Sequence, residues 1–484
     1  MFKRNGFTAV AAALTLILAG CGGGSGGGGE TAPGDSSALE DDGSQQQEPG
    51  GREALEVLTS TVMEKVTIDT KVYRPDVAIS DQGEALAVWA EEVNGKIRLA
   101  AVEGDAEEGT WGSKTFLDDG KGIYVPGSAW LSTQVTMDAS GNGMIGWIQS
   151  VEDSDKTHLK TIAYSTESGF DSPVDHGPTR SFILKGNDAG DVLIMWEMEF
   201  ALNKYDITSA FRPSGASSWE TKQNLTGGEE TGEYTSPNSL YLSRIAMNES
   251  GEATLLYKGT GPAVESNSRK LQALYRDANG EWSFPETLVE GAAITNVGPF
   301  ATAIDKAGNR FSGWVHRNSD DILLLGVMTT AEMAGSQNIE YFASIESAAR
   351  LAATYRKDGS LVVAAEQEMT SQGLRPLMTL EIIGEEVNQK VYGTGGRYLS
   401  LESAGNRVVS LGRNRCSTGM GVRESIEQGQ LMSEPLCSTG NAQENVELAV
   451  TPDRAGVFAG IGTVLDESTF PATRQNVVEL TFFR

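Results

Sequence analysis

The chain has 484 residues, of which 39% are hydrophobic and 57 are glycine. This balance is typical of many short strands joined by turns and argues against a fold of long helices. The formal net charge is −28, so we expect an acidic surface that repels nucleic acid and excludes a DNA- or RNA-binding role.

The first 20 residues have the pattern of a signal peptide. Lys3 and Arg4 are followed by an apolar run at 7–18 that is too short to span a membrane stably as a mature helix. Leu-Ala-Gly-Cys at 18–21 comes next and resembles the lipobox of bacterial lipoproteins. The resemblance implies cleavage before Cys21 and acylation of that cysteine, with palmitate as a typical chain, which gives a firm membrane anchor. The alternative is an ordinary secretory signal in which this cysteine is a coincidence.

Position 22 is glycine, not the aspartate that often marks retention of such lipoproteins in the inner membrane. The resemblance therefore implies the outer membrane, on its periplasmic side or at the cell surface. Residues 22–52 are rich in Gly, Ser, Gln and acidic residues, which predicts a flexible tether with a reach of about 30 Å. We expect three parts: a signal peptide at 1–20, the lipidated cysteine and tether at 21–52, and a folded domain at 53–484.

One phrase recurs through the folded domain: a turn with a glycine, followed by a short apolar run. It reads D-A-S-G-N-G-M-I-G-W at 138–147 and D-K-A-G-N-R-F-S-G-W at 305–314. The glycines that anchor its eight copies are Gly83, Gly141, Gly190, Gly251, Gly308, Gly359, Gly405 and Gly456. Six residues after the first five stand Trp89, Trp147, Trp196, Tyr257 and Trp314. A period near 50 residues with four short strands per unit predicts an all-β fold, a β-propeller of about eight four-stranded blades, with seven as the alternative.

The last unit ends after its third strand, at 476–484, whereas K-V-T-I-D at 65–69 precedes the first unit and looks like a fourth strand. We expect this N-terminal strand to complete the last blade and so close the ring. The segment 344–355 has a helical composition, but the period favours a strand over its second half.

A second turn in several units also ends on an aromatic residue, at Trp111, Phe170, Trp219 and Trp282. We expect both sets of rings to pack blade against blade. D-A-N-G-E-W at 277–282 resembles a degenerate Asp-box of sialidase-like propellers, although its Asp-to-Gly spacing differs and its serine is missing. Y-R-P at 73–75 is similar to the Y-R-I-P motif of sialidases with one residue absent. The resemblance implies a carbohydrate-active enzyme of sialidase-like type as an alternative function.

Two further cysteines, Cys416 and Cys437, each begin the sequence C-S-T-G. An even pair in an exported protein favours a disulfide. A metal pair is the alternative, but no histidine lies nearby in the sequence to complete a zinc site. We predict no cofactor and no metal.

The sequence contains three histidines and neither H-E-x-x-H nor G-x-S-x-G, so it indicates no catalytic residues. In a four-stranded blade the two marked turns lie on one side, the turn face. The connections from strand two to strand three and from blade to blade lie on the other side, the loop face. Loops of variable length and charge are typical of binding sites. We predict a largely acidic ligand surface on the loop face, with a basic sector from units five and seven, drawn from Glu91, Glu197, His316, Arg317, Glu366 and Arg413.

The favoured interpretation is an outer-membrane-anchored propeller that acts as a protein- or glycan-binding or scaffold module. Its predicted partners are the membrane, through the lipid anchor, and a protein or glycan. The alternatives are the sialidase-like enzyme and a metal-stabilised structural protein of the cell surface.

Overall fold

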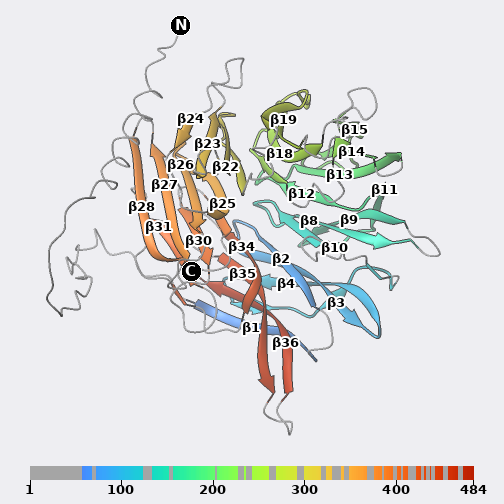
Figure 1. The fold of residues 1–484 in the computed structure, drawn as a ribbon. Helices are drawn as coiled ribbons and strands as arrows, with labels where there is room; N and C mark the ends of the chain where they lie inside the picture. The colour runs from blue at the N-terminus through green and yellow to red at the C-terminus, as the bar shows by residue number, and fades with distance from the viewer. Residues whose placement is uncertain are drawn as a thin grey trace, which may run out of the picture.

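The computed structural model describes residues 57–67, 72–120, 122–123, 133–151, 156–201, 204–226, 234–235, 243–260, 269–290, 299–317, 323–329, 340–342, 348–367, 375–383, 386–395, 400–404, 407–412, 421–426, 430–431, 436–437, 442–450, 456–466 and 473–483. These residues form strands and turns, and no helix among them is long and apolar enough to cross a membrane. The fold is an all-β β-propeller, as predicted (Figure 1).

Six of the hydrogen-bonded sheets are small, with four or five strands each. The first comprises β2 (Val72–Ile79), β3 (Glu84–Val93), β4 (Lys96–Asp105), β5 (Thr110–Trp111) and β6 (Thr115–Phe116). The second comprises β7 (Thr133–Met137), β8 (Gly143–Ser150), β9 (Thr157–Ser165), β10 (Gly169–Phe170) and β11 (Val174–Pro178).

Four more small sheets follow later in the chain. They comprise β21 (Phe300–Ile304), β22 (Arg310–Arg317), β23 (Leu323–Thr329) and β24 (Glu340–Phe342); then β25 (Ala348–Tyr355), β26 (Leu361–Gln367), β27 (Arg375–Ile383) and β28 (Glu386–Gly395); then β29 (Ser400–Ala404), β30 (Arg407–Gly412), β31 (Gly421–Ile426), β32 (Gln430–Leu431) and β33 (Leu436–Cys437); and last β34 (Ala442–Val450), β35 (Gly456–Asp466), β36 (Thr473–Phe483) and β1 (Val57–Thr67). Strand β25 confirms the strand predicted for the second half of 344–355.

A seventh, larger sheet has nine strands and takes in two successive repeat units. Its strands are β12 (Phe182–Gly186), β13 (Val192–Ala201), β14 (Lys204–Arg212), β15 (Gln223–Asn224), β16 (Tyr234–Thr235), β17 (Arg244–Met247), β18 (Ala253–Thr260), β19 (Arg269–Arg276) and β20 (Glu286–Glu290). The short strand β16 joins the two units because Thr235 pairs with Tyr205 of β14 and with Gly259 of β18. The prediction of eight separate four-stranded blades, or of seven, is therefore wrong: the described residues form six small sheets and one composite sheet.

The sheets follow one another around a ring, as the succession of colours in Figure 1 shows. The strands at its centre are the first strands of the repeat units. They contact one another in chain order, and the last contacts the first, through β2, β7, β12, β17, β21, β25, β29, β34 and again β2. The ring is therefore closed without a gap between the first and last sheets.

The N-terminal strand completes the last sheet, which confirms the predicted closure. β1 pairs antiparallel with β36, from Val57 opposite Phe483 to Thr67 opposite Gln475. The strand is longer than the predicted 65–69 and begins nearer the tether. Two ends of the chain that are far apart in sequence thus share one set of backbone hydrogen bonds.

The recurrent phrase forms the turn between the first two strands of a unit. In the copy at 138–142, Asp138 N donates to Asn142 O over 2.8 Å and Gly141 N donates to Asp138 O over 3.2 Å. The Asp138 carboxylate accepts bonds from the backbone N–H groups of Ser140 and Asn142, each at 2.8 Å. Gly141 has a φ of 85°, a conformation that other residues adopt only with strain. The aspartate therefore builds the turn and belongs to the scaffold.

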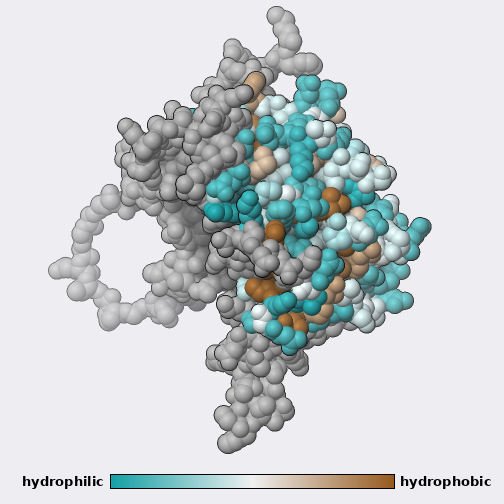
Figure 2. All heavy atoms as spheres, turned by 90° about the vertical axis from the view of Figure 1, so that its right-hand side faces the viewer, coloured by the Kyte–Doolittle hydropathy of each residue, from teal (hydrophilic) through white to brown (hydrophobic). Residues whose placement is uncertain are grey.

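On the face that Figure 2 shows, the described surface is mainly hydrophilic. In Figure 2 teal dominates and brown is confined to small, scattered areas. The exposed large hydrophobic side chains among these residues are Val174, at 44% exposure, and Phe284, at 86%. Single exposed hydrophobic residues are normal on a soluble surface and do not form a docking patch.

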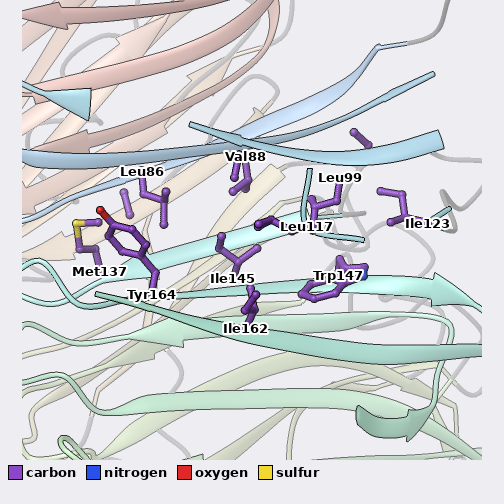
Figure 3. Close-up of a cluster of buried hydrophobic side chains, with 13 residues drawn as sticks. Leu86, Val88, Leu99, Leu117, Ile123, Met137, Ile145, Trp147, Ile162 and Tyr164 are labelled. Atoms are coloured by element: carbon purple, nitrogen blue, oxygen red, sulfur yellow. The ribbon is translucent and has the colours of Figure 1, made fainter. Parts of the chain in front are cut away.

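The aromatic residues of the phrase lie in the core between sheets. Trp89, Trp147 and Trp314 are 0% exposed, and Trp196 and Tyr257 are 1% exposed. Figure 3 shows Trp147 in a cluster with residues of the neighbouring first sheet, among them Leu86, Val88 and Leu99. The second set of rings is half-buried, and Trp111 stacks on Phe482 of the last sheet with centroids 4.6 Å apart. Both sets therefore pack blade against blade, as predicted, and burying rings of this size contributes about 2–3 kcal/mol each.

Candidate functional site

The loop face is the side on which the hairpins from strand two to strand three lie, such as Asn94–Gly95 between β3 and β4. Beneath it, the first and third repeat units, with the segments next to their strands, carry a set of buried or half-buried polar side chains. We call this set the loop-face layer; it consists of Glu91, Arg98, Lys114, Asp118, Thr179, Ser181, Glu197 and Tyr205.

Glu91 is part of this layer and is not an exposed ligand. Its side chain is buried, and the residue is 2% exposed. It accepts a hydrogen bond from the indole Nε1 of Trp89 and forms an ion pair with Lys114 Nζ, both at 2.6 Å. A buried indole N–H needs an acceptor and a buried carboxylate needs a partner cation. One carboxylate meets both needs, so Glu91 is committed to the scaffold.

A second ion pair lies beside the first. Arg98 Nε is 2.8 Å from both carboxylate oxygens of Asp118, whose side chain is fully buried. Asp118 also accepts bonds from the backbone N–H groups of Leu99 and Gly122. The Arg98 guanidinium and the Lys114 ammonium both lie over the ring of Phe116, at 4.6 and 5.2 Å from its centroid. The two pairs thus share one aromatic platform and hold the connection at 117–120 against the first sheet.

Glu197 is 0% exposed and occupies a corresponding place in the third unit. Its Oε2 accepts a bond from Ser181 Oγ at 2.8 Å, and its backbone N–H donates to Ser181 O at 3.1 Å. Thr179 Oγ1 donates to Glu197 O at 3.0 Å. These contacts fasten the segment just before β12 to the middle of β13. They leave no surface of Glu197 for direct contact with a macromolecular partner.

Tyr205 lies near Glu197 and is 1% exposed. Burial raises the pKa of its phenol, the Arg180 guanidinium opposes that shift, and the carboxylates of Glu199 and Glu197 add to it. Arg180 Cζ lies 5.4 Å from the centre of the tyrosine ring. A buried phenol with a raised pKa is a poor nucleophile, so this group supports the sheet and presents no reactive oxygen at the surface.

The second unit contributes two histidines with different surroundings. Burial lowers the pKa of His176 to about 4, and the nearby Lys222 adds to this effect. Its Nε2 is 2.8 Å from Thr161 Oγ1, and its ring meets Trp219 edge-on with centroids 5.0 Å apart. His176 is therefore neutral at physiological pH and packs between sheets.

His158 lies nearer the surface and contacts the carboxylate of Asp175 at 3.0 Å, as does Lys160 at 2.8 Å. Burial opposes ionisation of Asp175, but hydrogen bonds from Lys160 and His158 outweigh it and lower the pKa of this carboxyl to about 2. This cluster is half-exposed and carries both signs of charge. Within the described residues, no group of three or more His, Cys, Asp and Glu side chains could hold a metal ion.

For the other predicted ligand residues, the structure describes the position of the backbone only. His316 and Arg317 end β22 and pair with Leu324 and Leu323 of β23. Glu366 lies in β26 and pairs with Arg350. These positions stand toward the loop-face ends of their strands, and their role as ligand contacts stays a prediction; Arg413 lies outside the described residues. The structure does not bring Glu91 and Glu197 together, because they belong to the first and third units.

Cys437 ends β33, opposite Gly421 of β31. Cys416 lies outside the described residues, so the disulfide stays a prediction. Lys114, Asp118 and Ser181 were not predicted as site residues. Each pairs with a residue 16 to 23 positions away in the sequence, and no local motif marks such a pair.

No protein-family model matches this chain, and a comparison with curated proteins finds no match. Several solved structures are similar at low identity. The β-propeller domain of the Trilobed protease from Pyrococcus furiosus has 9% identity and a TM-score of 0.43, covering 77% of this chain and 97% of that chain. Polysaccharide lyase Uly1 has 9% identity and a TM-score of 0.43, covering 87% and 99%. Hadza microbial sialidase Hz136 has 10% identity and a TM-score of 0.37, covering 88% and 96%. These likenesses agree with the propeller fold and carry no argument about activity.

Proposed function

We propose that this protein is a lipid-anchored β-propeller of the outer membrane that binds a protein or glycan partner through its loop face. The anchor is Cys21, proposed from the Leu-Ala-Gly-Cys sequence at 18–21. The loop-face layer is the observation that supports a binding role most. It ties the ends of several strands together with buried ion pairs and hydrogen bonds, and so provides a rigid base for loops.

The burial of Glu91 and Glu197 changes which residues we propose as ligand contacts. Neither carboxylate is accessible, so the proposed contacts are the remaining candidates His316, Arg317, Glu366 and Arg413. Three of these four carry a basic side chain, and the proposed partner therefore presents anionic groups to units five and seven.

The test is a glycan array and a pull-down with the mature chain carrying Cys21→Ser, which keeps the protein in solution. A partner retained by the wild-type loop face should bind at least about tenfold more weakly to the double variant Arg317→Glu, Arg413→Glu. Ser140→Glu, on the turn face, is the matched control and should leave affinity unchanged. Equal affinity for all three proteins would remove the loop face of units five and seven from the proposed site.

A further inference from the structure

Strand β1 runs in a defined direction across the propeller, and this direction decides where the tether attaches. Val57, at its start, is opposite Phe483 of β36. Phe483 is opposite Gly456 of β35, and Gly456 is opposite Val450 of β34. These four residues form one row across the last sheet. Val450 ends the first strand of the last unit and Gly456 begins the second, so this row lies at the end of the sheet where the first two strands connect, and Val57 lies at the turn face.

The other end of β1 lies at the loop face. Thr67 is opposite Gln475, and Gln475 is opposite Val464, close to the connection between β35 and β36. The chain therefore enters the ring at the turn face and crosses to the loop face. The tether at 22–52 precedes β1, so it joins the folded body at the outer rim of the turn face.

We infer that the turn face is the side of the propeller nearest the membrane and that the loop face is presented away from it. This inference rests on the proposed anchor at Cys21. The tether reaches about 30 Å, and the ring is also about 30 Å high, because strands such as Lys96–Asp105 have 10 residues. To turn the loop face to the bilayer, the tether must extend by a full ring height, which costs chain entropy. We expect the loop-outward orientation to be populated about fivefold more.

The charge of the turn face keeps the body from lying flat on the bilayer. The exposed charged residues in the described turns are acidic, apart from Lys306 and Lys357: they are Asp81, Glu107, Glu108, Glu167, Asp188, Glu249, Glu281 and Asp358. An anionic bilayer repels such a surface, but only within about 8–10 Å. This range is much shorter than the reach of the tether. Repulsion therefore keeps the turn face from touching the lipid, and the attachment point of the tether determines which face is nearer the membrane.

The inference can be tested by energy transfer from a dye on the protein to an acceptor lipid in anionic vesicles. Gln82 and Lys96 are exposed and flank strand β3: Gln82 lies in the turn before it, and Lys96 begins β4 just after the hairpin at its other end, so the two positions differ mainly in height. An azide-bearing amino acid at either position takes the dye without involving the native cysteines. With the lipidated chain, we expect transfer from position 82 to exceed transfer from position 96 at least about twofold.

Variants with a shorter and a longer tether test the same inference. Deleting residues 30–49 should increase the ratio of the two transfers, and inserting a second copy of 22–52 should bring it toward one. A ratio of one at all three lengths, or a larger transfer from position 96, would overturn the inference.

A full-length mature chain with Cys21→Ser and a hexahistidine at its start, held on nickel-chelating lipid, separates the geometry from the lipid anchor. The same ratio is expected. If the natural chain fails to float with membranes, the proposed anchor is wrong, while the nickel-held chain still tests the orientation.

Discussion

Glu91 shows how a charged residue at the end of a strand can belong to the core. Its position two residues after Trp89 puts a carboxylate beside a buried indole N–H, and Lys114, from the segment between β5 and β6, neutralises it. The corresponding indole nitrogens of Trp147, Trp196 and Trp314 have no hydrogen-bond partner among the described residues. The first unit is therefore the place where this repeated ring is most firmly fixed.

Replacing Glu91 should reduce stability. In Glu91→Ala, Trp89 loses its acceptor and Lys114 its counter-ion, and we expect a loss of about 2 kcal/mol, because the lysine is partly exposed and solvent compensates for part of the ion pair. Glu91→Gln keeps an acceptor and should lose about half as much. Urea unfolding measures the change, with Glu92→Ala as the neighbouring control. An unfolding free energy for Glu91→Ala equal to that of the control would contradict the structural role.

His176 should make stability depend on pH. Its pKa is about 4 in the folded protein against 6.5 when exposed, so folding disfavours the protonated form. This contribution is fully present above pH 6.5 and is lost as the pH falls toward 4, by about 3 kcal/mol in all. Unfolding curves at pH 7.5, 6, 5 and 4 should show the loss in the wild type and in His158→Gln, but less of it in His176→Gln. Parallel curves for wild type and His176→Gln would show that another group is responsible.

At the scale of elements, the glycines of the turns share one backbone conformation and differ in the side chains that lie next to them. Gly190 and Gly359 have φ values of 93° and 87°. A Cβ on Gly190 would lie 2.7 Å from Ser214 Oγ and 2.9 Å from Asp138 Oδ2, whereas a Cβ on Gly359 would meet nothing within 4 Å. Asp138 Oδ2 is itself held by Asn142 at 2.9 Å, so it cannot move away freely.

These two glycines provide a matched test of the turn. Gly359→Ala should lose about 1 kcal/mol through backbone strain alone. Gly190→Ala should lose about 2–3 kcal/mol, because the same strain is joined by the clash with the neighbouring unit. Urea unfolding of the two variants measures both losses. Equal losses of unfolding free energy would mean that the neighbouring unit is not packed tightly against Gly190.

The sequence could predict these elements because each depends on local features. The glycine anchors, the apolar runs and the aromatic positions recur with a period. The structure places the first six anchors in turns and the five aromatic residues in the core, whereas Gly405 lies outside the described residues and Gly456 begins β35. The composite sheet could not be predicted, since β16 is two residues, Tyr234 and Thr235, within a long connection that no periodicity marks. Glu91 and Glu197 were expected at the surface because charge near a strand end is normally solvated. Their partners Lys114 and Ser181 come from segments just before other strands, β6 and β12.

At the scale of the whole molecule, stability depends on closing the ring. β1 pairs with the outer edge of β36. Val478, Leu480 and Phe482 of β36 are 0% exposed, and Phe482 stacks on Trp111 of the first sheet. The same C-terminal strand therefore supports both the pairing with the N-terminus and the packing of the last sheet on the first.

Deleting residues 53–70 should lower the Tm by many degrees, because it removes the partner of β36 and leaves an unpaired edge. Deleting residues 22–52 should leave the Tm unchanged, since it removes only the tether. Differential scanning calorimetry on the two truncated proteins measures both effects. Equal melting temperatures would mean that β1 adds nothing to the ring.

The pairing of β1 with β36 also determines when the protein can finish folding. Strand β1 is synthesised long before its partner β36 and must wait for it, because Thr67 pairs with Gln475, roughly 400 residues later. A chain that stops before β36, or is cleaved there by a protease, lacks the partner of β1 and leaves an edge of β35 unpaired as well. Only a chain that includes β36 can pair both edges.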